Sequence, residues 1–272
     1  APAHGVVVVT FIGGDGVEGH DRYGMADTFN GVGNYRLDKM EAGLGTEWEL
    51  ANNTTIVRLH PGSTAPGAAI DAMLDLAREH SLQASQVERI ELEVTPQCLA
   101  IAPYTTAHDS HKARFCLAYD MAVALIDKAA GLRQYTDERI RQSDVQQLMQ
   151  QVRVIVPDDL RHHRGQWGEE GVNWGEMRLK IVLKDGRALS TARSHARGWS
   201  EDPATWDDLA EKYRDCASDV LPQSQIEESI AMIAELESLP RVRKLMAELQ
   251  PRARNARRWS AHRSRWPWRD FC

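Results

Sequence analysis

The sequence predicts an α+β fold, in which a small sheet and several helices share one core and a helical part follows. Two observations support the mixed core: β-branched runs at 85–95, 152–156 and 176–191, and helical spacing of apolar residues at 66–80 and 111–128. A third observation supports the helical end, because helical patterns dominate from Pro203 onward.

The composition is that of an ordinary soluble globular protein. The 272 residues are 42% hydrophobic and 26% charged, and they suffice for one large domain or two ordinary ones. No apolar run approaches the roughly 20 residues that cross a bilayer. The run at 6–12 is short and lacks the basic region of a signal peptide. We therefore expect a cytoplasmic protein without a membrane partner.

Charge and cysteine spacing argue against further classes. The formal net charge of −6 disfavours a general nucleic-acid binder. The four cysteines are widely spaced and form no CxxC pair, so the sequence predicts neither a zinc site nor a disulfide framework.

Residues 1–54 carry short, interrupted patterns. The β-branched run at 1–12 fits a strand or the end of a buried helix, and residues 25–35 and 38–44 fit short helices. The glycines at 13–16 lack the Lys and Ser or Thr that complete a phosphate-binding loop.

The next segment predicts a strand, a turn and a helix. Residues 54–60 alternate like a strand, and apolar residues at helical spacing predict a helix over 66–80 with proline in its first turn. A further strand is expected at 85–95, with Arg89, Glu91 and Glu93 on its open side.

The middle of the chain predicts helices and a second strand. A polar loop leads to Asp109 and Ser110, which suit an N-cap, and a helix is expected over 111–128, ended by Gly131. Short capped helices are expected at 136–140 and 143–149, and a strand at 152–156.

The last elements are a hairpin and three helices. Residues 176–191 predict a β-hairpin whose Asp185 and Gly186 suit a type I′ turn. Helices are expected at 204–216, 223–237 and 241–249.

The tail at 251–272 differs sharply in composition from the rest. It interleaves seven arginines with three tryptophans, a mixture that can bind nucleic acid or an anionic membrane. It lacks an apolar helical stripe, which favours a disordered or weakly docked terminus instead. We therefore expect no nucleic-acid partner.

The best candidate site is the junction at 58–64, between the predicted strand and helix. Arg58, Ser63 and Thr64 would lie beside free N–H groups at a helix start, a combination that suits a carboxylate ligand. The alternative is an ordinary connection, in which Arg58 forms a surface ion pair and Ser63 or Thr64 caps the helix. His60 is a candidate for acid–base chemistry, or a structural histidine.

Other polar residues have structural roles as alternatives to functional ones. His108 and His111 flank Asp109, but their spacing does not place both on one helical face, so no metal site is predicted. Arg114 is a candidate to reach a cleft, whereas Tyr119 fits the core. The basic loop at 161–164 fits a solvated loop, with a partner contact as the alternative.

A series of short motifs follows in a fixed order over residues 17–249. They are 18–24 (Glu-Gly-x4-Gly), 44–48 (Leu-Gly-x-x-Trp), 58–63 (Arg-Leu-His-Pro-Gly-Ser), 69–72 (Ala-Ile-Asp-Ala), 90–94 (Ile-Glu-Leu-Glu-Val), 112–119, 136–140, 184–186 and 211–213. No single motif is specific, but their order resembles that of the MmgE/PrpD family, which includes 2-methylcitrate dehydratases, cis-aconitate decarboxylases and an iminodisuccinate epimerase.

The resemblance implies a two-domain architecture with an all-helical domain and an α+β lid. On that basis residues 1–54 are a remnant of the helical domain, 55–200 are the lid with an antiparallel or mixed sheet, and 201–250 are helices of the helical domain. Most of the helical domain then has no counterpart in this sequence. The resemblance also implies a homodimer that needs no cofactor.

The resemblance also implies a lyase-type enzyme that acts on a small di- or tricarboxylic acid, in propionate or related carboxylic acid metabolism. Substrate-binding residues would be Arg58, Ser63, Thr64 and Arg114, and His60 would be catalytic. Relatives have a lysine where this chain has Arg58, which preserves carboxylate binding but not proton exchange. The alternative is a non-catalytic fragment, or a subunit that needs a partner to supply the helical catalytic half.

Overall fold

The computed structural model describes residues 34, 36, 45, 46, 48, 56–161 and 175–251. The chain divides into two units, Ala1–Thr55 and Ile56–Cys272, and all elements described below belong to the second. The expected strand at 1–12, almost all of the helices expected at 25–35 and 38–44, and the tail beyond residue 251 lie outside the described residues. The basic loop expected at 161–164 does as well, apart from Arg161.

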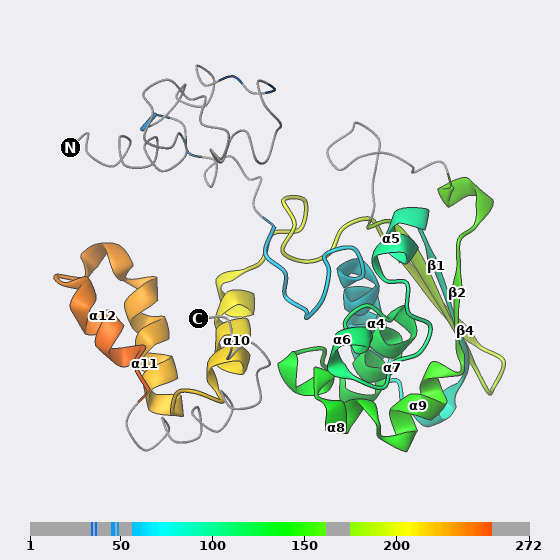
Figure 1. Ribbon diagram of the computed structural model, residues 1–272. Helices are drawn as coiled ribbons and strands as arrows, with labels where there is room; N and C mark the ends of the chain where they lie inside the picture. Colours follow the sequence, from blue (N-terminus) through cyan, green and yellow to red (C-terminus); the bar gives the residue numbers. More distant parts are fainter. Residues whose placement is uncertain are drawn as a thin grey trace. The chain divides into compact units, whose positions relative to one another are not determined.

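A four-stranded mixed sheet lies at one side of the second unit (Figure 1). Its order is β2-β1-β3-β4, with β1 and β2 parallel and the other neighbours antiparallel. This sheet, together with the helices, confirms the predicted α+β class. The strands are β1 (Val87–Val94), β2 (Val152–Ile155), β3 (Met177–Leu183) and β4 (Ala188–Arg193).

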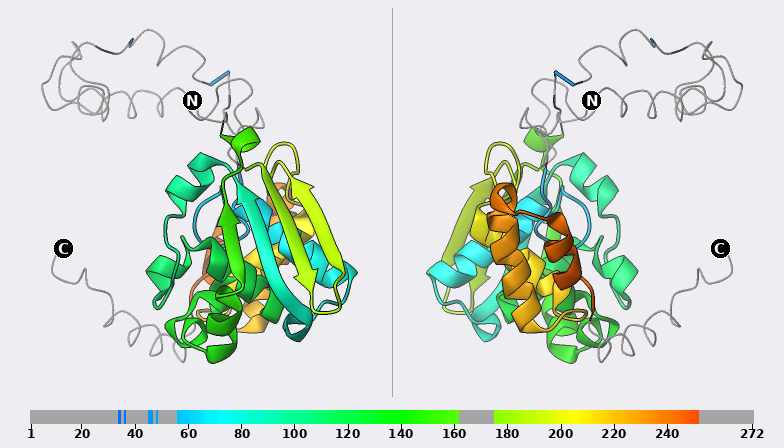
Figure 2. Two further views of the ribbon diagram at one scale, coloured as in Figure 1. Left: turned by 90° about the vertical axis from the view of Figure 1, so that its right-hand side faces the viewer. Right: turned by 90° about the vertical axis from the view of Figure 1, so that its left-hand side faces the viewer.

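One face of the sheet forms the main core with two helices, α4 (Gly67–Glu79) and α7 (Leu117–Asp127) (Figure 2). Alternate residues of β1 and β3 point into this core, among them Ile90, Leu92 and Leu179, each at most 1% exposed. Helix α7 is buried over most of its length, so it is the central helix. Each such side chain contributes about 1.5–3 kcal/mol by leaving water, which makes this face the main source of stability.

The opposite face of the sheet is polar, as predicted for β1. Glu91 Oε1 accepts a hydrogen bond from Arg89 at 2.9 Å, Glu91 also lies 3.6 Å from Lys180, and Glu93 pairs with Arg178 at 2.9 Å. Solvent-exposed pairs of this kind contribute about 0–1 kcal/mol each, so they keep the face soluble rather than hold the sheet together.

Short helices complete this part of the unit, and α10 (Trp206–Ala217), α11 (Gln223–Ala234) and α12 (Val242–Glu248) lie on the side of α4 and α7 away from the sheet (Figure 1). Helices α10 and α11 share a small core that includes Ala210, Leu221 and Ile226. No helix among the described ranges is long and apolar enough to cross a bilayer. The remaining elements are η2 (Ala84–Gln86), α5 (Pro96–Ile101), α6 (Ser110–Ala113), η3 (Leu132–Tyr135), α8 (Asp137–Ile140), α9 (Ser143–Met149), η4 (Asp158–Leu160) and η5 (Leu236–Ser238).

The predicted strand at 54–60 is wrong for the part that the structure describes. Residues 56–60 form no strand, and the backbone partner of this segment is Gly198, whose carbonyl accepts a hydrogen bond from Val57 N at 2.9 Å. A strand needs a paired neighbour, and residues 56–60 pair with none of the four strands.

The single helix predicted over 111–128 is also wrong, because it is divided into α6 and α7. The N-cap is as predicted, since Asp109 accepts from Lys112 N at 2.9 Å. The Phe115 carbonyl accepts from Tyr104 N instead of continuing the helix, and Cys116 is extended. The helix then ends at Asp127, before Gly131, because Lys128 adopts a left-handed conformation at φ +55°.

The hairpin is confirmed, but its turn is not type I′. Gly186 N donates to the Leu183 carbonyl at 3.0 Å, and Lys184 and Asp185 keep negative φ while Gly186 lies at +85°. This is a type I turn followed by a left-handed glycine, the usual three-residue hairpin loop. The sequence Asp-Gly fits both turns, so it cannot separate them.

Candidate functional site

The predicted junction is closed by a glycine packed against the backbone of Arg114. Gly62 has φ +100°, and a Cβ atom at this position would lie 2.3 Å from the Arg114 carbonyl oxygen. Arg58 Nη1 donates to the Gly62 carbonyl at 2.7 Å. The absence of a side chain at position 62 therefore lets two segments, each carrying an arginine, approach one another.

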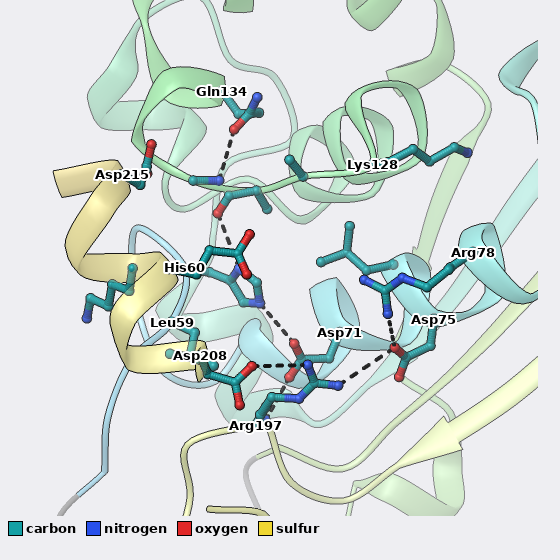
Figure 3. Close-up of a pocket in the computed structure, with 16 residues that line it drawn as sticks. Leu59, His60, Asp71, Asp75, Arg78, Lys128, Gln134, Arg197, Asp208 and Asp215 are labelled. Carbon is teal, nitrogen blue, oxygen red and sulfur yellow. Dashed lines mark hydrogen bonds and ion pairs between the residues drawn. The ribbon is translucent and has the colours of Figure 1, made fainter. Parts of the chain in front are cut away.

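His60 ties this junction to the core on two sides (Figure 3). Its Nε2 lies 2.9 Å from Asp71 Oδ1 on α4, and its Nδ1 lies 3.2 Å from the carbonyl oxygen of Ala130. The side chain is 15% exposed, whereas that of Asp71 is 5% exposed. His60 is therefore held by hydrogen bonds rather than free in solvent.

Asp71 is a buried carboxylate with cationic and N–H neighbours. Its Oδ2 accepts a hydrogen bond from Arg197 N at 2.7 Å and lies 3.7 Å from Arg193 Nη1. Arg193 also pairs with Asp75 at 2.7 Å. These contacts place the end of β4 and the segment after it against α4.

A hollow of about 390 Å³ lies beside the junction, and we call it the cationic hollow. Arg58, His111, Arg114 and Lys212 supply positive or titratable groups, and Asp215 is the one carboxylate among the lining residues. Lys212 Nζ donates to the Arg58 carbonyl, which joins α10 to the junction. The full lining is Arg58, Leu59, His60, Pro61, Gly62, His111, Arg114, Phe115, Gly131, Leu132, Lys212, Asp215 and Cys216.

A second hollow of about 260 Å³ lies on the other side of His60, and Figure 3 shows it. It is mixed in charge, with Arg197 between Asp75 and Asp208 at 3.9 and 3.6 Å. Because its charges pair with one another, it presents less unbalanced positive charge than the cationic hollow.

The predicted site residues divide between neighbouring spaces. Arg58, His60 and Arg114 line the cationic hollow together. Ser63 and Thr64 instead line a recess of about 10 Å³ that also includes Arg58 and His60. Neither hydroxyl caps α4, whose N-cap is Pro66 without a side-chain cap bond.

The sequence interpretation missed several lining residues. Lys212 lies on α10, 154 positions after Arg58, and the sequence indicates its segment only as a family motif. The same holds for Asp71. The sequence suggests His111 only as a metal ligand, whereas its ring packs against Tyr104 and Phe115. The described ranges contain no group of three metal-ligating side chains.

A further acid, Asp120 on α7, is buried near this site. It is 1% exposed and accepts a hydrogen bond from the Tyr135 hydroxyl at 2.6 Å, while its Oδ2 has no hydrogen-bond partner among the described residues. Burial raises the pKa of Asp120 to about 7, opposed by the Tyr135 hydrogen bond and by the charge of His60.

Comparison with known proteins adds two findings. The family model of the MmgE/PrpD C-terminal domain matches residues 60–238, which include His60, Ser63, Thr64 and Arg114 and begin two positions after Arg58. A cis-aconitate decarboxylase of Mus musculus is 22% identical over 250 residues, which are 88% of this chain and 48% of the relative. The chain therefore spans about half the length of the curated relative that it matches.

Proposed function

Because this chain belongs to the MmgE/PrpD family, we propose that it takes part in a lyase-type reaction on a small di- or tricarboxylic acid. The reaction is dehydration, decarboxylation or epimerisation next to a carboxylate. The observation that carries this proposal is the cationic hollow, where Arg58, Arg114 and Lys212 surround a space of about 390 Å³. The similar mouse protein is named for a reaction on such an acid.

In this proposal the arginines bind the carboxylates of the substrate. A guanidinium group can form two parallel hydrogen bonds with one carboxylate and stays charged at any physiological pH. Arg58 already donates to Gly62 through one nitrogen, which fixes the side chain and leaves other donors for a ligand. Removing a proton next to a carboxylate builds negative charge, and nearby cations stabilise that charge.

The other predicted residues keep the roles assigned above as part of the proposal. Ser63 and Thr64 line the recess next to Arg58 and supply hydroxyl groups for orientation. His60 is the candidate for proton transfer. A cytoplasmic homodimer without a cofactor, in propionate or related acid metabolism, completes the proposal.

A test of the carboxylate role is acid binding by arginine variants. We expect Arg58→Ala and Arg114→Ala each to weaken citrate binding by roughly ten- to a hundredfold, since a charge-assisted hydrogen bond contributes about 1.5–3 kcal/mol. Isothermal titration calorimetry measures the affinity, and binding should weaken as salt is added. Arg153→Ala is the control, because this exposed arginine of β2 is not part of the lining of the hollow. Unchanged citrate affinity in both variants would refute the assignment.

A second test uses Cys216, which is exposed on α10 and lines the cationic hollow. Cys98 and Cys116 are buried, and burial raises their pKa to about 12 and about 11, so both stay as unreactive thiols. In a Cys272→Ser background, iodoacetamide should label Cys216, and saturating citrate should slow this labelling several-fold. Mass spectrometry of time points measures the rate. Equal rates with and without citrate would place the ligand elsewhere.

The alternative function is a non-catalytic fragment or a partner-dependent subunit. Exposed apolar side chains on and near the C-terminal helices fit a surface that another polypeptide covers; these are Trp206, Leu236, Val242 and Met246. Turnover of citrate-like, methylcitrate-like and aconitate-like acids by the isolated chain separates the two functions. Activity without a partner would exclude the alternative.

A further inference from the structure

Both ring nitrogens of His60 face oxygen atoms that accept hydrogen bonds. Nδ1 lies 3.2 Å from the Ala130 carbonyl oxygen and Nε2 lies 2.9 Å from Asp71 Oδ1 (Figure 3). A carbonyl oxygen and an ionised carboxylate accept but do not donate, and a neutral imidazole carries one N–H group. Only the doubly protonated ring satisfies both contacts, because in either neutral tautomer one nitrogen lone pair faces an oxygen lone pair.

The contacts of Asp71 favour its ionised form. Its Oδ2 receives the Arg197 backbone N–H at 2.7 Å and lies 3.7 Å from Arg193 Nη1, while its Oδ1 faces His60. Each of these three neighbours is a donor or a cation. A buried carboxylate without a partner is costly, so a positive imidazolium at 2.9 Å is the stable arrangement.

Both positive and negative groups surround His60, and the group in direct contact with the ring has the largest effect on its protonation. The buried Asp120 on α7 interacts electrostatically with His60 and adds negative charge only where it is ionised. Among the charged groups of the described residues, Asp71 is the one hydrogen-bonded to the ring. Charged and titratable side chains from several elements line the two hollows beside His60. They are Arg58; Asp71, Asp75 and Arg78 on α4; His111 on α6; Arg114, Lys128 and Arg197; and Asp208, Glu211, Lys212 and Asp215 on α10, with Arg193 of β4 next to Asp71.

We propose that Asp71 is the positioning residue of His60 and holds it doubly protonated, so that His60 meets a bound acid as a donor. His60 then serves as a cation, a hydrogen-bond donor or a source of a proton, and it does not serve as a base. Only the presence of the acid rests on the function proposed above. The protonation of the ring rests on its own contacts.

Nδ1 is the donor that turns to a ligand. Its contact with Ala130 is longer than the contact of Nε2 with Asp71, and Ala130 has no charge to hold it. His60 and Gly131, the residue after Ala130, both line the cationic hollow. A ligand carboxylate oxygen that replaces the Ala130 carbonyl gains a charge-assisted hydrogen bond while Asp71 keeps the ring in place.

Nitrogen-15 NMR of the full chain tests this inference directly. The two nitrogens of an imidazolium resonate close together, whereas those of a neutral ring lie far apart. At about pH 7.5, where an ordinary histidine is neutral, we expect one histidine with the imidazolium pattern, and we expect it to be absent in His60→Asn. A neutral pattern for His60 in the wild-type protein overturns the inference.

Variants then test the part of Asp71. In Asp71→Asn the ring should adopt the neutral pattern at about pH 7.5, and citrate affinity should fall several-fold. Asp75→Asn is the matched control on the same helix, and it should leave the imidazolium pattern intact. If the Asn variant does not fold, Asp71→Glu keeps the charge and should retain the pattern. An imidazolium that persists in folded Asp71→Asn refutes the role of Asp71.

The same measurements separate this inference from the proposed function. If His60 is protonated in the wild-type protein but citrate, tricarballylate and methylcitrate do not bind, the proposed acid-binding function is wrong and the inference about the ring stands. If citrate binds and His60 is neutral, the function stands and the inference is wrong.

Discussion

Gly62→Ala is expected to destabilise the protein by about 2–4 kcal/mol and to abolish measurable citrate binding. Alanine is strained at φ +100°, and its Cβ would lie 2.3 Å from the Arg114 carbonyl oxygen. The obstacle is backbone, which cannot rotate away as a flexible side chain can. The segment that carries Arg58 must therefore move away from the segment that carries Arg114, and the cationic hollow loses its geometry.

Gly186→Ala separates the two causes of this effect. Gly186 also has a positive φ, +85°, but no atom lies within 4 Å of the position that a Cβ would occupy. This variant meets the conformational strain alone, so we expect a loss of about 1–2 kcal/mol and normal citrate binding. Urea unfolding and calorimetry measure both quantities. Equal losses in the two variants would show that the junction relaxes freely, and Gly62 would then have no special part in the site.

The core could be predicted from the sequence because its signals are local. The alternation of Ile90, Leu92 and Val94 indicates a strand with one buried face, and the structure confirms it. The helix that carries Ile70 and Met73 was predicted from spacing in the same way. Periodicity works here because each residue's burial depends on its own position within the element.

The errors occur where a tertiary hydrogen bond overrides a local pattern. Residues 56–60 alternate like a strand, but a strand also needs a paired neighbour, and Val57 N donates to the Gly198 carbonyl instead. The helix predicted over 111–128 is divided in two because Tyr104 N donates a hydrogen bond to the Phe115 carbonyl. Neither partner is near in sequence, so no window over the segment itself reveals it.

The candidate site shows the same division. Arg58 and His60 were found because they occur together before a helix. Lys212 lines the hollow only because α10 packs beside the junction. Arg114 lies close to the junction because Gly62 has no side chain. Membership of the MmgE/PrpD family is confirmed by the family match, whereas the domain limits at residues 54 and 200 stay predictions.

Asp120 should make the stability of the protein depend on pH. Burial raises its pKa to about 7 in the folded state, whereas an unfolded aspartate titrates near 4. Between these values the folded chain binds the proton and the unfolded chain does not. The free energy of unfolding therefore falls as pH rises from about 4 to about 7 and changes no further above that.

Asp120→Asn removes this pH dependence. Asparagine is uncharged at every pH, and its Oδ1 can still accept the Tyr135 hydroxyl hydrogen. A pKa shift of about three units corresponds to at most about 4 kcal/mol. As the pH is raised from about 4.5 to about 8, we therefore expect the free energy of unfolding of the variant to rise by about 2–4 kcal/mol relative to that of the wild type. Any effect of the amide group that does not depend on pH cancels when this difference is compared between two pH values. It would not cancel in a measurement at one pH.

Urea unfolding at a series of pH values measures this gain, with Asp219→Asn as the control because Asp219 is exposed. The control should differ from the wild type by a nearly constant amount. A flat difference for Asp120→Asn as well would mean that the buried carboxyl stays ionised. A second negative charge would then lie near His60, which strengthens the hold on its proton, so the result bears on the site even if the stability prediction is wrong.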